Sequence, residues 1–400
     1  MAGYEFRAIE PTETRAFTDA IYGAFQGEPQ DEEIALWSGR IEPERTRVAT
    51  HEGAIVGTSG LFTLRIAVPG AVVPMAGVTA VGVDPSHRRR GLLDGMMNAL
   101  LEEVRERGEE AISALWASEA GIYGRWGFGS ATRWAEVTVR SREAQLRRPP
   151  DDRPRGGEPK ALLPELRAVY DALPRRPGML ERDEHAWGEV LMDVEAHREG
   201  AGRLRALVCD GGYATYAVRK HDIDGRADDI VELRELHAAG PEAAAVLWDH
   251  LLKLSLTRSV HWWAGAEDLE LPHMLFDARA VTMRLDDGLY VRLVDLPRAL
   301  AQRTYRAPVD VVLEVADDVC PWNAGRWRLA ADATGATCEP TTAPADIALG
   351  VLELGTAYLG GPPLATLGAA GRVEEATPGA LAAASHAFLG ERPPWAFEVF

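Results

Sequence analysis

The hydrophobic positions of the first 145 residues follow two periods in turn, one typical of strands and one typical of helices. Apolar residues recur at helical spacing at Phe17, Ile21 and Phe25, and an amphipathic helix is predicted for residues 92–107. Short β-branched or alternating runs predict strands at residues 4–9, 47–51, 54–62, 64–68, 78–83, 111–116 and 131–140. This alternation of strands and helices indicates a domain of the α+β type.

A second region with the same alternation follows a segment rich in proline, glycine and charge. That segment, residues 147–164, is interpreted as an exposed linker. Asp224-Gly225 separates two β-rich runs and predicts a hairpin turn, because a calcium loop would need another ligand spacing and a late glutamate. Strands are predicted at residues 204–210, 213–219 and 230–236, and helices at 168–173, 184–192 and 241–256.

The last part of the chain repeats both patterns and ends in an aromatic tail, Pro393 to Phe400. Strands are predicted at residues 289–294, 309–315, 325–330 and 347–352, and helices at 296–305, 354–359 and 378–389. We therefore predict an α+β protein with three domains, which comprise residues 1–145, 146–287 and 288–400. The length of 400 residues agrees with this, since it is too great for one ordinary domain.

The charge of the chain restricts its partners. The 43 lysines and arginines against 61 acidic residues give a formal net charge of −18. A nucleic-acid partner would require a basic face, so none is expected. A negative protein attracts polycationic amines, although the same charge would also serve solubility alone.

Cysteine usage and hydropathy exclude further classes of protein. Cys209, Cys320 and Cys338 lie far apart and lack the spacing of metal ligands, so no metal site is expected. The N-terminus has no apolar signal core, and no apolar run reaches about 18 residues. We therefore expect a cytoplasmic protein without a membrane partner.

A cluster of cations marks a candidate anion site. The β-branched run 78–83 ends at Asp84-Pro85, and His87-Arg88-Arg89-Arg90-Gly91-Leu92-Leu93 then precedes the predicted helix. The N–H groups and dipole of a helix N-terminus favour an anion, and Gly91 allows close approach of the backbone. The loop lacks the Lys-Ser or Lys-Thr of a nucleotide-hydrolase loop and the three spaced glycines of a dinucleotide site. The pattern predicts a site for a pyrophosphate.

A second motif, Ser118 to Gly129, follows the next predicted strand and reads SEAGIYGRWGFG. Its tyrosine, Tyr123, carries a phenol that stays protonated at neutral pH, because its ordinary pKa is about 10. It can therefore donate a proton to a departing thiolate. The alternative is an aromatic side chain that only packs beside a turn.

These two motifs together resemble those of the GCN5-related N-acetyltransferases (the GNAT superfamily), and most closely the Eis (enhanced intracellular survival) family within it. Arg88-x-x-Gly91 matches the coenzyme loop of the superfamily, whereas Leu93 stands where its pattern has Gly or Ala. The similarity in layout runs the whole chain to Phe400. It implies two GNAT-like domains, a C-terminal sterol-carrier-like domain, acetyl-CoA as co-substrate and a homo-hexamer that is a dimer of trimers.

The resemblance also implies roles for single residues. Tyr123 would be the general acid, and the α-carboxylate of Phe400 would take the proton of the amine; the alternative for Phe400 is an ordinary tail anchored by its ring. By their own chemistry, and not from the resemblance, Trp37 could stack on a sugar or cover an amine and Glu398 could attract a cationic substrate; the alternative for each is a structural role. The residues expected to bind the coenzyme are Val81, Val83, Arg88, Arg89, Gly91, Leu92, Ser118 and Ile122.

The second GNAT-like domain is expected to be degenerate. At the place of the basic loop it has His237-Ala238-Ala239-Gly240-Pro241, without the cations that would hold a pyrophosphate. The leading hypothesis is an acetyl-CoA-dependent N-acetyltransferase that acts by direct attack, in a ternary complex, on primary amines of aminoglycoside-like molecules or polyamines. The alternatives are a protein lysine N-acetyltransferase and a non-catalytic module that binds acyl-CoA or lipid.

Overall fold

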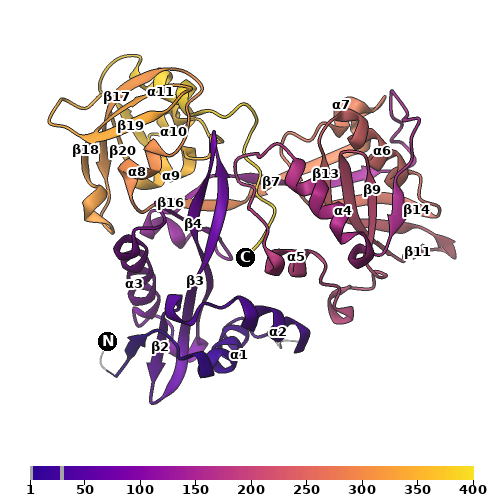
Figure 1. Ribbon diagram of the computed structural model, residues 1–400, viewed down its shortest axis with the longest axis horizontal. Coiled ribbons are helices and arrows are strands. Elements are labelled where there is room, and N and C mark those ends of the chain that lie inside the picture. The colour runs from indigo at the N-terminus through magenta and orange to yellow at the C-terminus, as the bar shows by residue number, and fades with distance from the viewer. Residues whose placement is uncertain (1–2, 28–30) are drawn as a thin grey trace. The chain divides into compact units, whose positions relative to one another are not determined.

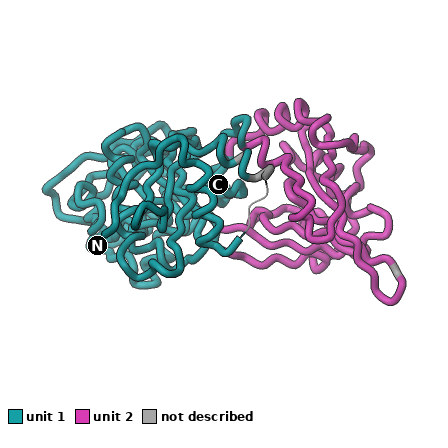
Figure 2. The backbone as a smooth tube through the Cα atoms, turned by 90° about the horizontal axis from the view of Figure 1, so that it is seen from below, with its two compact units in different colours: residues 1–132, 176–185, 287–400 teal, residues 133–175, 186–286 magenta. Residues whose placement is uncertain are grey.

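The computed structural model describes residues 3–27 and 31–400 and shows two compact units (Figures 1 and 2). The first unit contains Met1–Thr132, Arg176–His185 and Asp287–Phe400, and the second contains Arg133–Arg175 and Ala186–Asp286. In the described part of the chain, no helix is long and apolar enough to cross a membrane.

The first unit is built around a mixed sheet of seven strands. Helices α1 (Thr14–Ala24) and α2 (Asp31–Arg40) lie on one side of it and α3 (Leu92–Arg107) on the other (Figure 1). Buried apolar side chains of α3, such as Met97 and Leu100, pack against Val78. The strand order is β1 (Glu5–Arg7), β2 (Val48–His51), β3 (Ala54–Val68), β4 (Ala71–Val83), β5 (Ile112–Trp116), β16 (Leu289–Leu293) and β6 (Gly129–Ser130).

An irregularity in β4 shapes the centre of this sheet. β4 pairs with β5 in parallel only at Met75, Ala76 and Gly77. Farther along β4, Ala80 has φ +56°, and the register with β3 shifts at this point. Two residues of β4 then oppose one residue of β3, which is a β-bulge and bends the strand. Beyond Gly77, the end of β4 is therefore bent by the bulge and is not paired with β5.

Two strands differ from the sequence-based assignment. The strand after the aromatic turn, β7 (Arg133–Arg140), was assigned to the first sheet but pairs with β14 (Thr257–Ala266) in the second. Conversely, β16, assigned to the start of the third domain, pairs with β5 and β6 in the first sheet. All five residues of β16 are buried, so the strand needs neighbours on both sides. Arg292, the fourth of its five residues, concealed this, because an arginine predicts an exposed position.

The second unit holds another seven-stranded sheet, in which α4 (Pro159–Ala172) and α6 (Pro241–Leu252) pack against the central strands. The strand order is β15 (Val281–Asp287), β7, β14, β13 (Asp229–Ala238), β10 (Gly212–Arg219), β9 (Arg205–Cys209) and β8 (Arg155–Gly157). The second unit also contains two short helices, α7 (Leu271–Met274) and most of α5 (Glu184–Val190). The first residues of α5 belong to the first unit.

One expectation for this region is confirmed and another is wrong. Asp224 and Gly225 both have positive φ and connect β11 (Asp222–Ile223) to β12 (Arg226–Ala227), so the segment is a hairpin. The segment 147–164 is not a simple linker, because β8 pairs with β9 and α4 begins at Pro159. Proline suits the first turn of a helix, where its missing N–H is not needed, so the same residues that suggested a linker start a helix here.

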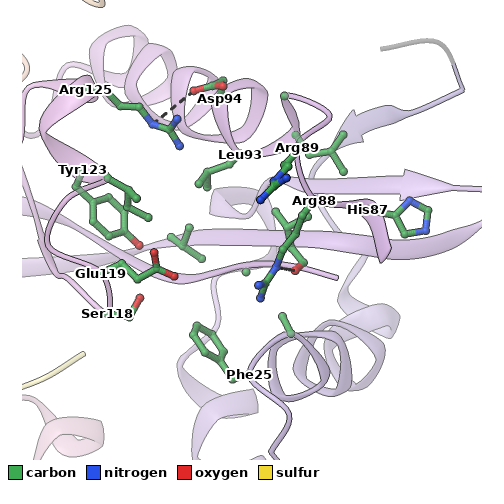
Figure 3. Close-up of a pocket in the computed structure, with 17 residues that line it drawn as sticks. Phe25, His87, Arg88, Arg89, Leu93, Asp94, Ser118, Glu119, Tyr123 and Arg125 are labelled. Carbon is green, nitrogen blue, oxygen red and sulfur yellow. Dashed lines mark hydrogen bonds and ion pairs between the residues drawn. The ribbon is translucent and has the colours of Figure 1, made fainter. Parts of the chain in front are cut away.

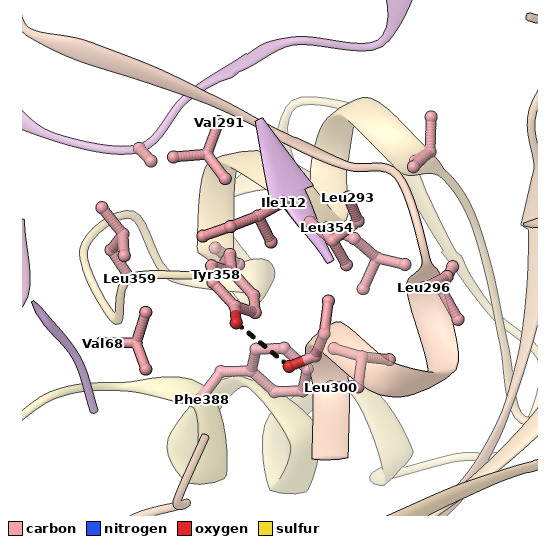
Figure 4. Close-up of a cluster of buried hydrophobic side chains, with 14 of the residues drawn as sticks. Val68, Ile112, Val291, Leu293, Leu296, Leu300, Leu354, Tyr358, Leu359 and Phe388 are labelled. Atoms are coloured by element: carbon pink, nitrogen blue, oxygen red, sulfur yellow. Dashed lines mark hydrogen bonds between the residues drawn. The ribbon is translucent and has the colours of Figure 1, made fainter. Parts of the chain in front are cut away.

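The C-terminal part of the first unit forms a five-stranded sheet with four helices. Its buried side chains continue into the core of the first sheet, where Ile112 and Val291 meet Leu354 and Tyr358 (Figure 4). The strands are β19 (Ala336–Pro340), β18 (Gly325–Ala331), β17 (Val309–Ala316), β20 (Ile347–Gly350) and β21 (Val373–Glu375). The helices are α8 (Leu296–Ala301), α9 (Val351–Ala357), α10 (Leu364–Ala369) and α11 (Ala380–Phe388).

A short segment from the middle of the chain, Arg176–His185, also belongs to the first unit. It lies along β3, where the N–H of Ala67 donates to the carbonyl of Met179 at 2.8 Å. On this segment the C-terminal tail is held by a hydrogen bond from the N–H of Trp395 to the carbonyl of Pro177, also 2.8 Å long. The tail is therefore fixed to the first sheet through this intermediate segment, which makes an isolated bridge between Leu180 and Ile66.

Candidate active site

A cavity of about 540 Å³ opens between the end of β4, the N-terminus of α3 and the turn after β5 (Figure 3). Every residue that the sequence predicted for coenzyme binding lines it, and Tyr123 lines it as well. The lining residues are Ala24, Phe25, Val81, Gly82, Val83, His87, Arg88, Arg89, Gly91, Leu92, Leu93, Asp94, Ser118, Glu119, Ile122, Tyr123 and Arg125.

The basic loop turns sharply before α3. A short 3-10 helix, η3 (Pro85–His87), is capped by Asp84, whose carboxylate accepts from the N–H of Ser86 at 2.8 Å. Arg89 and Gly91 then both adopt left-handed backbone conformations, with φ +61° and +79°. Such a conformation is strained for arginine and is typical of functional loops. The loop thereby leads directly into the N-terminus of α3.

The N-terminus of α3 suits an anion. The N-cap residue is Gly91, which offers no side chain to the first N–H groups of this 16-residue helix. In the described part of the chain, Arg88, Arg89 and Arg90 have no carboxylate within ion-pair distance. Free N–H groups, a helix dipole and the uncompensated guanidinium groups of Arg88 and Arg89, which line the cavity, together favour a diphosphate. The residues present therefore fit the pyrophosphate of a coenzyme.

The strand side of the cavity comes from β4. Val81 and Val83 lie in the part of this strand that continues beyond its last pair with β5, Gly77 with Ala114. Backbone groups on that edge are available to a linear amide chain, which can bind by adding to the strand. The end of α1 packs closely against Gly82. A Cβ on Gly82 would lie 2.8 Å from the Cβ of Ala24. This contact brings Phe25 to the mouth of the cavity.

Tyr123 lies at the opposite end of the cavity from the basic loop (Figure 3). It opens the 3-10 helix η4 (Tyr123–Trp126), is only 3% exposed, and packs against the rings of Trp126 and Phe128 at centroid distances of 6.1 and 6.5 Å. Burial raises the pKa of its phenol, and a hydrogen bond with the Ser118 hydroxyl offsets part of that rise. The phenol therefore stays protonated at neutral pH.

The glycines around Tyr123 are explained by helix α9, which packs onto this turn. Gly127 has φ +77°, and a Cβ there would lie 2.8 Å from Val351. A Cβ on Gly129 would overlap the carbonyl oxygen of Leu352. The C-terminal part of the chain thus supports the turn that carries the candidate acid.

The buried Arg292 of β16 also packs against the turn that carries Tyr123. Its guanidinium lies 3.0 Å from the position of a Cβ on Gly127. One nitrogen, Nη2, donates to both carboxylate oxygens of Asp317 at 2.8 Å. A buried charge requires such a partner, and Asp317 follows β17 in the C-terminal sheet. Two strands from distant parts of the sequence therefore hold the tyrosine turn in place.

Phe400 and Trp37 do not line this cavity but lie on the other face of β4. Successive side chains of a strand point to opposite faces. Ala76 and Val78 pack on the face that holds Tyr123, whereas Met75 packs in the cluster that contains Phe400. A Cβ on Gly77 would lie 2.8 Å from the Phe400 ring, so the terminal residue seats on β4 where its pairing with β5 ends.

Trp37 lies nearby on that face. Its ring lies 5.7 Å from the ring of Phe62, which belongs to the same cluster as Phe400. It also lines a narrow space beside Thr79 and Ala80, the residues at the bulge of β4. Glu398 is placed differently, because its carboxylate accepts from Arg182 at 2.9 Å.

Sequence reasoning missed several residues of this site. Phe25, Glu119 and Arg125 line the cavity. Phe25 served only as a helix position in the hydrophobic pattern, and Glu119 and Arg125 belong to the motif 118–129 but were given no role. Arg182, which binds the tail, lies in a segment without any recognisable signal. Among the described residues, no group of three or more His, Cys, Asp or Glu side chains is placed to hold a metal ion.

Comparisons with known proteins agree with these features. The model of a GNAT acetyltransferase domain matches residues 5–131, a second GNAT model matches residues 178–293, and a sterol carrier protein domain matches residues 296–396. The crystal structure of Eis1 from Mycobacterium abscessus superposes with a TM-score of 0.87 at 31% identity, covering 99% of this chain and 100% of that one.

Relatives of similar length carry the same name for their activity. An uncharacterised N-acetyltransferase of Streptomyces avermitilis is 41% identical over 98% of each chain. The N-acetyltransferase Eis of Mycobacterium bovis is 35% identical over 86% of each chain. With two GNAT domains, a sterol-carrier-like domain and these relatives along its length, the chain belongs to the Eis-like N-acetyltransferases of the GNAT superfamily, enzymes that use acetyl-CoA.

Proposed function

We propose that this enzyme transfers the acetyl group of acetyl-CoA to primary amines of polycationic small molecules, with Tyr123 as general acid and the α-carboxylate of Phe400 as general base. The observation that carries the proposal is the close packing of the Phe400 ring against Gly77. The chain terminus lies on one face of β4 where its pairing with β5 ends, and Tyr123 packs on the other face.

Each residue has a defined task in this reaction. Bound acetyl-CoA supplies a thioester whose acyl carbon forms the new bond to the amine nitrogen as the bond to sulfur breaks. Tyr123 holds its proton at neutral pH and donates it to the departing sulfur. The carboxylate of Phe400 accepts the proton that the amine loses, directly or through one water. Arg88 and Arg89 hold the diphosphate beside the N-terminus of α3.

The preference for a polycationic substrate rests on charge and on Trp37. The net charge of −18 attracts cations, and Trp37 lies on the same face of β4 as Phe400. An aromatic face binds cations and covers apolar parts of sugars. A protein lysine would need the same chemistry, so the substrate panel below includes a lysine peptide.

A C-terminal extension tests this mechanism. Adding Gly-Ser after Phe400 keeps the ring but moves the carboxylate by two residues, roughly 7 Å. Thiol release from acetyl-CoA is measured with an aminoglycoside, a polyamine and a lysine peptide. We expect the native enzyme to acetylate the first two faster than the peptide. The extended enzyme should lose at least about 10²-fold in kcat, as for loss of a general base. Full activity of the extended enzyme would exclude the terminal base.

A further inference from the structure

His87 and Arg90 of the basic loop form a polar cluster with Tyr4 that has no part in the chemistry at Tyr123. The Tyr4 hydroxyl lies 2.9 Å from Nδ1 of His87, and Nη1 of Arg90 donates to that hydroxyl at 2.8 Å. His51 stacks on the Tyr4 ring at a centroid distance of 4.8 Å. Tyr4, the residue before β1, is thereby tied to the loop that precedes α3.

The hydrogen bonds of this cluster leave one ring nitrogen of His87 for a ligand. Arg90 can only donate, so the Tyr4 oxygen is the acceptor in that bond. The hydroxyl proton of Tyr4 can then go to Nδ1 of His87, which places the ring proton on Nε2. His87 lines the cavity, so the cluster offers it a hydrogen-bond donor supported by the charge of Arg90.

The position of His87 in the cavity indicates which group this donor would meet. Tyr123 and His87 lie at opposite ends, with Arg88 and Arg89 between them (Figure 3). In acetyl-CoA, the thioester, the pyrophosphate and the 3′-phosphate of the adenosine follow one another along the molecule. With the thioester at Tyr123 and the pyrophosphate at Arg88 and Arg89, the next anionic group falls beyond the loop, on the side of His87.

We propose that Tyr4, His87 and Arg90 form a subsite for the 3′-phosphate of the coenzyme and so select acetyl-CoA over donors that lack this group. The proposal rests on the use of acetyl-CoA in the proposed function. A phosphate monoester carries a charge of about −1.5 to −2 and three acceptor oxygens, which match a guanidinium and an N–H donor. A local excess of cations in a protein of net charge −18 also calls for such a ligand.

The test compares acetyl-CoA with 3′-dephospho-acetyl-CoA as donors. The native enzyme should show a KM for the dephospho donor at least tenfold higher, with kcat nearly unchanged. The variants Tyr4→Phe, His87→Ala and Arg90→Ala should raise the KM for acetyl-CoA about five- to tenfold. They should leave the KM for the dephospho donor within twofold, because that donor does not reach the subsite.

A matched control removes a cation away from the loop, at the C-terminal end of α3. Arg107, at the far end of α3, pairs with Glu109, and Arg107→Ala should change neither KM. A direct binding measurement supports the kinetics: adenosine 3′,5′-bisphosphate should compete with acetyl-CoA more strongly than AMP does, and Tyr4→Phe should remove the difference.

The outcomes separate this proposal from the one on which it rests. Turnover with equal KM for both donors would overturn the subsite and leave the acetyltransferase intact. Variants that raise both KM values equally would assign the cluster to the structure of the loop, and would also overturn the subsite. No turnover with either donor would instead count against the proposed function, and the nucleotide competition would then still decide whether the subsite exists.

Discussion

Glu398 and Arg182 form an ion pair of 2.9 Å in which the arginine side chain is fully buried and the glutamate side chain is 11% exposed. The backbone carbonyl of the same Glu398 accepts a hydrogen bond from the indole N–H of Trp116 at 2.8 Å. Phe400 follows two residues after this anchored point. The carboxylate that the sequence suggested for substrate contact is thus engaged within the protein, and we expect it to act by positioning the terminus.

Arg182→Met should lower kcat at least tenfold while the KM for acetyl-CoA stays within twofold. The reason is that Arg182 binds the tail through Glu398 and is not one of the residues that line the coenzyme cavity. Removing one partner of a buried pair also destabilises a protein by about 3–5 kcal/mol. The double variant Arg182→Met/Glu398→Met removes both charges and serves as the control for folding. A double variant that regains stability but not kcat supports positioning; normal kcat in the folded single variant contradicts it.

Gly77→Ala should displace the terminal ring. The new Cβ would lie 2.8 Å from the ring of Phe400 and 2.6 Å from Leu64, closer than side chains approach one another. We expect a loss of kcat with little change in the KM for acetyl-CoA. Gly23→Ala is the matched control, because a Cβ there meets nothing within 4 Å. Equal activity of the two variants would show that the position of Phe400 does not matter.

Tyr123→Phe should lower kcat about 10²-fold or more, as expected for loss of a general acid. The ring keeps its contacts with Trp126 and Phe128, so stability in thermal melts should change little. Because burial raises the pKa of this phenol, the acid form persists as pH rises. The native rate should therefore not fall on the alkaline side until the pH exceeds about 10, the ordinary tyrosine value. A native-like kcat in the variant would return Tyr123 to a packing role.

The double variant Arg88→Ala/Arg89→Ala should raise the KM for acetyl-CoA at least tenfold and leave kcat at saturation nearly unchanged. Charge-assisted hydrogen bonds contribute about 1.5–3 kcal/mol each, and these residues lie far from the reacting atoms. Glycine would relax the left-handed backbone of Arg89, whereas alanine keeps a Cβ there. Comparing Arg89→Gly with Arg89→Ala, which both lack the charge, therefore isolates the effect of strain, and an unchanged KM in the double variant would disprove the loop assignment.

Local signals account for the parts of the site that the sequence determined by itself. The predicted helix 92–107 has the bounds of α3, since Gly91 and Gly108 stop it on both sides and its apolar period is regular. The cations before it and the aromatic turn after β5 were recognised as motifs, and the structure brings them to one cavity. Each of these features depends on residues that are neighbours in the chain, so its pattern is visible without the fold.

Tertiary structure alone decided how these pieces are joined. The exchange of β7 and β16 between sheets depends on pairing across more than 100 residues, and a five-residue strand that contains an arginine carries no mark of its partner. At the bulge of β4 the residue with positive φ is Ala80 and not a glycine, so no residue type at that position predicts the bulge. The seat of Phe400 requires Gly77 below it and Arg182 beside the tail, both distant in sequence. Non-local packing and buried charge pairs select among arrangements that local propensity leaves equal, which is why only the folded chain places its terminus against β4.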